Sequence, residues 1–255
     1  MIDVDVIQTG SKGNCYIINM NGFKFMIDCG SKLMGQYQLE HNFNNINCCF
    51  ISHAHQDHCQ YVNKLNPYNI KLVASKETFR TMEHEGMHIT SNRLVLGNLI
   101  LHRQTINMMN DFEYMAFEVP HDSPNYGFMF KYKHKKVVYI TDCGHIPQKW
   151  YDLPNYQKIF ENVDVLMIEA NYSEAYSKPG LIDEKLRTRV LGPNGHLSLE
   201  ESMKFVKHLR KTNPRMQTLL LHYSEKQTTP EIRSNLIKGE PKGIYWANKN
   251  QQFKF

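Results

Sequence analysis

The sequence lacks several features that would each define a class of protein. None of its apolar stretches approaches the roughly 20 residues that a membrane-spanning helix needs. Residues 1–6 contain acidic side chains and no basic region of the kind that begins a secretory signal. We therefore expect a protein of the cytoplasm that has no membrane partner.

Cysteine is present, but not in a pattern that indicates a zinc knuckle or a disulfide framework. The chain has six cysteines, and no pair of them shows C-x-x-C spacing. A reducing compartment would keep them as thiols, so we expect most of them to be small buried hydrophobic residues. Cys59 and Cys143 adjoin candidate metal ligands, and their roles remain open at this point.

The chain shows no low-complexity linker, no internal repeat and no heptad pattern, so we predict a single domain, residues 1–255. Short strand-like segments dominate the first half, and an apolar strand, a helix and another apolar strand follow in the second. This order predicts two sheets packed together with helices outside, an αββα sandwich of the α/β (α+β) class. The expected strands are 4–8, 15–19, 23–28, 47–52, 71–74, 93–102, 114–119, 126–132, 137–141, 163–168 and 218–222.

Local signals mark the starts of helices and one tight turn. Ser75 is expected to cap a helix that extends to about residue 85. Ser198 and Glu201 have the spacing of a capping box in front of a helix over 199–211. Thr229 precedes a proline that suits a first helical position. Asn-Gly at 21–22 predicts a hairpin turn.

The densest group of metal-binding side chains is His53, His55, Asp57 and His58, directly after the apolar residues 48–51. In a strand, residues i and i+2 point the same way, so His53 and His55 can converge on one metal. The turn that follows can direct Asp57 and His58 at a second metal. Imidazole and carboxylate ligands suit zinc, manganese or iron. A single histidine would indicate little, but this spacing after a buried strand predicts a metal site.

This motif resembles the signature of the metallo-β-lactamase superfamily, whose fold has two mixed β-sheets with helices on the outer faces. The resemblance implies that Asp28 ties down the metal-binding loop without touching metal. It implies two divalent ions, zinc or manganese, with ligands that follow apolar strands: His53, His55 and His121 for one, Asp57, His58 and His222 for the other, and Asp142 as a bridge. Two such ions about 3.5–4 Å apart generate a bridging hydroxide and hold both oxygens of a displacement at phosphorus.

Other segments resemble the YycJ/WalJ group of this superfamily, whose members act as 5′→3′ exonucleases on double-stranded DNA. They are residues 10–14, 121–123, 127–128, 168–171, 191–198 and 221–225. Lys12 departs from the group, which usually has serine there; it either adds a phosphate contact or is a neutral surface change. Ligation by histidine and aspartate alone also fits the phosphodiesterase and nuclease branches. The resemblance therefore implies a phosphodiesterase with DNA as its substrate.

Asp57, Glu169 and His196 form the expected catalytic set. The arrangement of Glu169 and His196 is similar to that in ribonuclease Z, in which a glutamate and a histidine form a proton-donating pair. We hypothesise that Glu169 orients His196 and raises its pKa, so that the imidazolium protonates the departing oxygen. The alternative is that Glu169 braces a loop and His196 supports a helix or a ligand.

A basic segment supplies candidates for substrate binding. Lys185, Arg187 and Arg189 would grip a phosphate backbone from a loop above the metals, and Asn171 would join them. A solvated helix face is the alternative, because residues 183 and 184 are acidic. The net charge of +5 is compatible with an anionic substrate but does not identify nucleic acid.

Two other functions compete with DNA cleavage. The same metals could hydrolyse a small phosphodiester such as a cyclic nucleotide, which would favour a closed pocket over an open basic groove. A non-catalytic scaffold is the second, but the complete ligand set argues against it. The sequence leaves open whether the chain forms a homo-oligomer.

Overall fold

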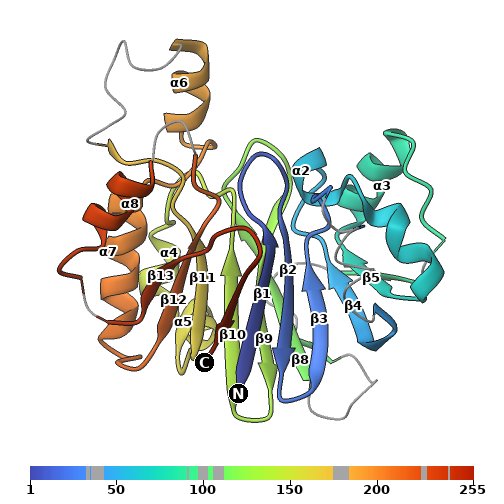
Figure 1. Cartoon of the computed structure of the whole chain (residues 1–255), viewed down its shortest axis with the longest axis horizontal. Helices are drawn as coiled ribbons and strands as arrows, with labels where there is room; N and C mark the ends of the chain where they lie inside the picture. The colour runs from blue at the N-terminus through green and yellow to red at the C-terminus, as the bar shows by residue number, and fades with distance from the viewer. Residues whose placement is uncertain are drawn as a thin grey trace. The chain divides into compact units, whose positions relative to one another are not determined.

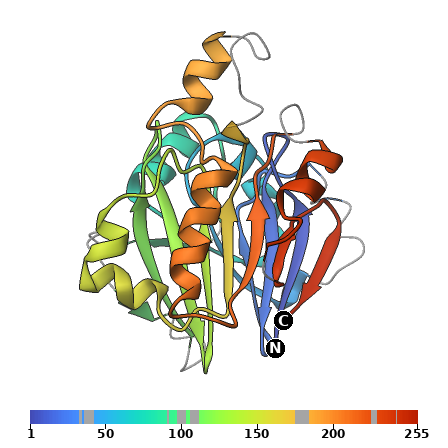
Figure 2. The same cartoon turned by 90° about the vertical axis from the view of Figure 1, so that its left-hand side faces the viewer.

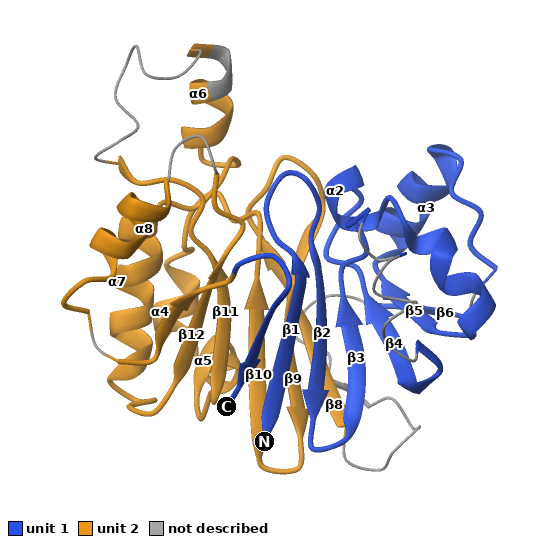
Figure 3. Cartoon of the chain, viewed as in Figure 1, with its two compact units in different colours: residues 1–102, 248–255 blue, residues 103–247 orange. Residues whose placement is uncertain are grey.

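The computed structural model describes residues 1–32, 35, 43–90, 92–96, 103–105, 112–174, 184–224, 229–240 and 242–255. The chain divides into two compact units, which Figure 3 shows in different colours. Unit 1 comprises Met1–His102 and Asn248–Phe255, and unit 2 comprises Arg103–Ala247. Within the described residues, each unit is built on one seven-stranded sheet. The single domain remains a prediction.

The sheet of unit 1 has the strand order β14-β1-β2-β3-β4-β5-β6 (Figure 1). Its strands are β1 (Ile2–Gln8), β2 (Cys15–Met20), β3 (Phe23–Ile27), β4 (Ile46–Phe50), β5 (Lys71–Ala74), β6 (Arg93–Val95) and β14 (Gln251–Lys254). β14, β1, β2 and β3 pair antiparallel, and β3 to β6 pair parallel. The expected turn joins β2 to β3, with positive φ angles of 50° at Asn21 and 95° at Gly22.

Short helices follow the parallel strands of unit 1. They are η1 (Phe43–Asn45), α2 (Gln56–Cys59), η2 (Val62–Tyr68) and α3 (Lys76–His84). The hydroxyl of Ser75 accepts a hydrogen bond from the main-chain nitrogen of Thr78, which confirms the predicted cap. Phe79 and Met82 on α3 are buried in an apolar cluster that also includes Leu72 of β5. This packing holds α3 against the sheet.

The sheet of unit 2 has the strand order β13-β12-β11-β10-β9-β8-β7. Its strands are β7 (Arg103–Thr105), β8 (Phe112–Val119), β9 (Asn125–Tyr132), β10 (Lys135–Ile140), β11 (Val165–Glu169), β12 (Gln217–Leu221) and β13 (Ile244–Trp246). β10 to β13 pair parallel, and β8 is antiparallel to β9, which is antiparallel to β10. β8, β10, β11 and β12 therefore run the same way, and their carboxyl ends lie at one edge of the sheet.

The helices of unit 2 are α4 (Lys149–Asp152), α5 (Pro154–Phe160), α6 (Glu184–Leu191), α7 (Leu199–Arg210) and α8 (Pro230–Leu236). Figure 2 shows α7, in orange, lying along the sheet, where it contacts β11. Ser198 and Thr229 cap α7 and α8 as predicted. The capping box is incomplete, because the carboxylate of Glu201 accepts a hydrogen bond from the main-chain nitrogen of Ile146, 2.7 Å away.

The fold class is confirmed: the chain consists of two mixed sheets with helices. The short elements α4, α5, β7, β13 and β14 were not predicted, since their sequences show no clear periodicity. The expected strand 93–102 is observed as β6, and its later part lies outside the described residues. Among the described residues, no helix combines the length and apolar character that a membrane span requires.

Candidate metal centre

In unit 1, Asp28 organises the segment that carries four of the predicted ligands. It follows β3, is fully buried and has a positive φ of 57°, a backbone conformation that aspartate tolerates better than most residues. Its carboxylate accepts hydrogen bonds from the main-chain nitrogen of Ser52 (2.8 Å), from the Ser52 hydroxyl (3.0 Å) and from Nδ1 of His58 (2.7 Å). These contacts fix the position of the segment that carries His53, His55, Asp57 and His58.

The same carboxylate determines which ring nitrogens of two histidines carry protons. Because Nδ1 of His58 donates to Asp28, its Nε2 carries a lone pair. The single proton of the Ser52 hydroxyl is also directed at Asp28, so Nδ1 of His53, 3.0 Å from that hydroxyl, is the donor to it. Nε2 of His53 is therefore a lone-pair nitrogen as well. Both rings are in the tautomer that can bind metal.

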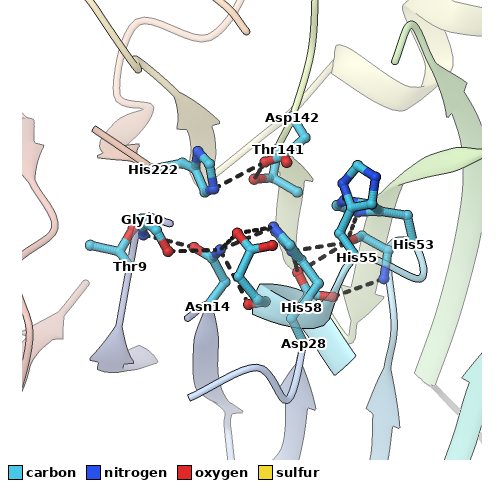
Figure 4. Close-up of polar contacts among 12 residues, drawn as sticks. Thr9, Gly10, Asn14, Asp28, His53, His55, His58, Thr141, Asp142 and His222 are labelled. Atoms are coloured by element: carbon cyan, nitrogen blue, oxygen red, sulfur yellow. Dashed lines mark hydrogen bonds and ion pairs between the residues drawn. The ribbon is translucent and has the colours of Figure 1, made fainter. Parts of the chain in front are cut away.

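The lone pair of His53 is directed at the neighbouring predicted ligand. Nε2 of His53 lies 3.0 Å from Nδ1 of His55, and Figure 4 shows the two rings side by side beyond β4. Two nitrogens bound to one zinc ion at about 2.0–2.1 Å in tetrahedral geometry are roughly 3.3 Å apart. The observed separation therefore fits a shared ion, as the i, i+2 spacing predicts.

Asp57 and His58 form a second pair in unit 1. They lie in α2, and Oδ2 of Asp57 is 3.4 Å from Nε2 of His58. A carboxylate oxygen and a lone-pair nitrogen at this distance can bind one ion together. Unit 1 thus presents two pairs of donor atoms, both composed of side chains that suit zinc or manganese.

Gly30 allows the backbone of Asp57 to approach the loop that follows β3. A Cβ atom at Gly30 would lie 1.8 Å from the main-chain oxygen of Asp57 and 2.5 Å from the nitrogen of His58. Both neighbours are backbone atoms, so no side-chain rotation relieves the overlap. The position of the Asp57–His58 pair therefore depends on a glycine at residue 30.

We predict that Gly30→Ala destabilises the protein by about 2–4 kcal/mol, because a backbone overlap must be relieved by moving α2. The same movement should reduce the amount of metal that the protein retains. Chemical denaturation and metal analysis measure the two effects. Gly35→Ala is the control, since the described residues place nothing within 4 Å of a Cβ there. Equal behaviour of the two variants would contradict the assigned role of Gly30.

In unit 2, three predicted ligands follow strands at the same edge of the sheet. Asp142 follows β10 and His222 follows β12; both are 2% exposed and have positive φ angles of 46° and 52°. Oδ1 of Asp142 lies 3.3 Å from Nε2 of His222, and its Oδ2 lies 3.6 Å from Nε2 of His121 (Figure 4 shows the His222 contact). Each oxygen of Asp142 therefore faces one histidine, an arrangement in which the carboxylate could bind one ion through each oxygen.

In unit 2, the carboxylate of Glu169 accepts hydrogen bonds from histidines, as the carboxylate of Asp28 does in unit 1. It is fully buried at the end of β11, and its Oε1 accepts hydrogen bonds from Nδ1 of His196 (2.7 Å) and Nδ1 of His222 (3.1 Å). Oε2 accepts from the main-chain nitrogens of Cys143 (2.6 Å) and Leu197 (3.3 Å). His222 is thereby held with its lone pair on Nε2, the atom that faces Asp142.

The pair of Glu169 and His196 is electrostatically coupled. Burial alone would raise the pKa of the Glu169 carboxyl, but the charge of His196 and the hydrogen bonds of His196 and His222 outweigh it and lower that pKa. Burial would lower the pKa of His196, and the Glu169 carboxylate reverses this and raises it. Both shifts favour the charged forms, a carboxylate beside an imidazolium. With Asp142 and His222 these groups could also surround an ion, but Glu169 would then have to give up hydrogen bonds.

The two cysteines beside predicted ligands bond to the backbone. Sγ of Cys59 donates to the main-chain oxygens of Ala54 and His55, and Sγ of Cys143 donates to that of His145. Burial raises the pKa of Cys59 to about 12 and that of Cys143 well above the usual thiol range. Both remain protonated near neutral pH, which agrees with ligation by histidine and aspartate alone.

The basic segment forms a helix, which agrees with the alternative of a helix face and not with a loop: α6 begins at Glu184, and residue 183 lies outside the described residues. Nη1 of Arg187 lies 3.4 Å from Oε2 of Glu184, within the same helix. Arg189 is 66% exposed and lies 3.7 Å from Oδ2 of Asp122, whose Oδ1 is 3.2 Å from Nε2 of His121. One end of α6 therefore adjoins a predicted ligand.

Of the other two predicted substrate contacts, Asn171 is buried and the side chain of Lys185 is not among the described residues. The amide nitrogen of Asn171 donates to the main-chain oxygen of His222 at 2.8 Å, and Asn171 is 6% exposed. Two further asparagines, Asn14 and Asn125, were not predicted: the amide of Asn125 donates to the main-chain oxygens of Thr141 and Asp142, both at 2.9 Å.

The chain belongs to the β-lactamase superfamily: the profile of the β-lactamase superfamily domain matches residues 24–223, which include every predicted metal ligand. The fold and the family define it as a metal-dependent hydrolase of the metallo-β-lactamase fold.

Among individual proteins, the chain is similar to exodeoxyribonuclease WalJ of Streptococcus pneumoniae, with 26% identity over 89% of this chain and 83% of that protein. It is 23% identical to exodeoxyribonuclease YycJ of Bacillus anthracis, over 77% of this chain and 73% of that protein. The crystal structure of the metallo-β-lactamase fold protein YhfI from Bacillus subtilis superposes with a TM-score of 0.72 and 15% identity, covering 99% of this chain and 98% of that chain.

Proposed function

We propose that this chain is a two-metal phosphodiesterase that degrades DNA in the 5′→3′ direction. The observation that carries the proposal is the edge of the unit 2 sheet, where a carboxylate facing two histidines lies beside the Glu169–His196 pair. Such an edge combines metal ligands with a proton donor, which phosphate ester cleavage needs. The exonuclease names of WalJ and YycJ support DNA as the substrate.

The proposed ligands are those that the order of motifs in the superfamily implies. They are His53, His55 and His121 for one ion, Asp57, His58 and His222 for the other, and Asp142 between them. The hydrogen bonds of Asp28 and Glu169, which direct the lone pairs of His53, His58 and His222, support this assignment. Bound zinc or manganese ions would supply an activated water and neutralise charge on the phosphate.

Two side chains, Glu169 and His196, are proposed to supply the proton that the leaving group needs. Glu169 holds Nδ1 of His196, which leaves the Nε2 proton of the imidazolium for the oxygen that departs from phosphorus. Asp57 is proposed as a catalytic residue as well as a metal ligand. A ligand carboxylate beside the attacking water can accept a hydrogen bond from that water. His196 thus acts as general acid, and Glu169 keeps it charged.

Lys185, Arg187, Arg189 and Asn171 are the proposed contacts to the DNA backbone. We predict that reversing the charge of Arg187 and Arg189 together weakens DNA binding and reduces the salt dependence of the affinity, by about one unit of slope for each lost phosphate contact. Binding measured over a range of salt concentrations gives the slope.

The matched control reverses the charge of Lys204 and Lys207, two exposed residues of α7, and changes the net charge of the protein equally. An unchanged slope in the α6 variant, or the same change in both variants, would show that α6 carries only a solvated face.

The substrate class is tested with the purified protein on four substrates: a 5′-phosphorylated duplex, single-stranded DNA, RNA and a cyclic nucleotide, each with manganese and with zinc. Cleavage of the duplex at the highest rate is expected. Much faster hydrolysis of the cyclic nucleotide would replace this proposal with that of a small-molecule phosphodiesterase.

All six cysteines are buried free thiols, which supports a reducing compartment such as the cytoplasm.

A further inference from the structure

Asn14 lies between the glycine-containing loop at residues 10–13 and β2, and its side chain is fully buried. Its Oδ1 accepts hydrogen bonds from the main-chain nitrogen of Gly10 at 2.9 Å and from the hydroxyl of Tyr16 at 3.3 Å. A main-chain nitrogen can only donate, so these contacts settle which end of the amide is oxygen. The other end of the amide is therefore the NH₂ group, which lies near the main-chain oxygens of Gly10 (3.2 Å) and Asp57 (3.4 Å) and near the side chains of Asp57 and His58 (Figure 4 shows Asn14 beside His58).

The NH₂ group of Asn14 faces two donor atoms for metal. Nδ2 lies 3.0 Å from Nε2 of His58 and 3.3 Å from Oδ2 of Asp57. Nε2 of His58 accepts here, because Nδ1 of the same ring donates to Asp28. Without metal, the partly positive amide hydrogens thus hold the same nitrogen and oxygen that a cation would attract, 3.4 Å apart. A bound cation would take the single lone pair of His58 Nε2 from the amide, whereas Oδ2 of Asp57 has a second lone pair and can keep its contact with Asn14.

The backbone of Asn14 holds the same segment. Its main-chain nitrogen donates to the oxygen of Asp57 at 2.7 Å, and its main-chain oxygen accepts from the nitrogen of Gly30 at 2.9 Å. The backbone hydrogen bonds place Asp57, whereas the side-chain amide directs its carboxylate and the ring of His58. Since the Asp57 side chain is 25% exposed, losing the amide would allow the carboxylate to turn toward water.

We infer that Asn14 is a positioning residue that prearranges Asp57 and His58 for one of the two divalent ions. This inference rests on the proposed metal assignment. It adds a residue that binds neither the substrate nor the metal and acts by orienting two metal ligands. Residues that orient metal ligands typically contribute 10–100-fold in affinity, and we expect Asn14→Ala to weaken one ion by about that factor. The other ion should be held as in the unchanged protein.

The test titrates the metal-free full chain with zinc, and separately with manganese, against a chelator, and fits two stepwise dissociation constants. Asn14→Ala should weaken the same step that Asp57→Asn weakens, because both changes act on one pair of ligands. Asn14→Ser, which retains a polar group toward Gly10, is a milder variant for the case that alanine prevents folding. Denaturation curves of all variants accompany the titrations.

Asn213→Ala is the matched control, because Asn213 is also buried and its side chain bonds to the backbone of Phe160, Leu209 and Val163 and to the Thr212 hydroxyl, none of which is a predicted metal ligand. It should lose stability and keep both affinities. Wild-type affinities in Asn14→Ala and Asn14→Ser, or equal weakening of both steps, would overturn the inference. Failure of the unchanged protein to bind two ions would overturn the metal assignment and the inference together, whereas a protein that binds two ions but leaves DNA intact would contradict only the substrate.

Discussion

Replacing His55 with alanine should abolish hydrolysis while the protein stays folded. His55 is half-buried beside Nε2 of His53 and is not part of the buried apolar core, so its removal leaves the core intact. Loss of one ion removes several kcal/mol of stabilisation from the reacting phosphate, which corresponds to about 10³-fold or more in rate. Activity on a DNA duplex, metal content and circular dichroism measure the effect.

Asp142→Asn should act in the same way, because asparagine tolerates the positive φ of 46° but brings no charge to share between two ions. His134→Ala changes an exposed histidine of the β9–β10 turn and is the control for loss of an imidazole. Full activity in His55→Ala or in Asp142→Asn would refute the two-metal assignment.

A second large effect is expected at His196. His196→Ala should reduce turnover on DNA by about 10²–10⁴-fold with both metals retained, since the departing alkoxide loses its proton donor. A nitrophenyl phosphodiester has a leaving group that needs no proton, so its hydrolysis should be reduced far less. Turnover of the two substrates by the same preparation gives the comparison.

His145→Ala is the control for this experiment, because His145 is exposed and its Nδ1 contacts the main-chain oxygen of Pro193. It should cleave both substrates like the unchanged protein. If His196→Ala loses equal activity on the activated ester and on DNA, His196 is not the acid, and Glu169 and His196 instead brace the loop.

The pH dependence of turnover follows from the same pair. His196 must be protonated to donate, and the Glu169 carboxylate raises its pKa against the opposing effect of burial. Turnover on DNA should therefore persist to higher pH than an ordinary histidine would allow, and fall as the pH rises through this raised value. The fall should be absent for the activated ester.

The sequence predicted the strands of both sheets well where apolar residues alternate or run together. Asp28, Asp142 and His222 could be placed at strand ends because each directly follows such a run. The strand β14 was missed, since Gln-Gln-Phe-Lys has little apolar character and is stabilised by its pairing with β1. For the basic segment that forms α6, the sequence left a loop and a helix face as alternatives, and only the folded chain distinguishes them.

The ligand types were evident from spacing, but their proton positions were not. Only the folded chain shows that one buried carboxylate in each unit, Asp28 and Glu169, receives the Nδ1 protons that leave lone pairs toward a metal. The contacts of Asn14 and Asn125 join segments distant in the sequence, and a single asparagine carries no periodic signal. The roles of such residues can be identified only from the hydrogen bonds in the folded structure.

The most direct test of a metal-dependent 5′→3′ exonuclease follows a duplex that carries its label on the 5′ nucleotide. With manganese or zinc, we expect labelled mononucleotide as the first product, none after chelation, and none from His55→Ala with metal present. A label that remains on long fragments while the duplex is degraded, or cleavage that continues at the same rate without metal, would contradict this expectation.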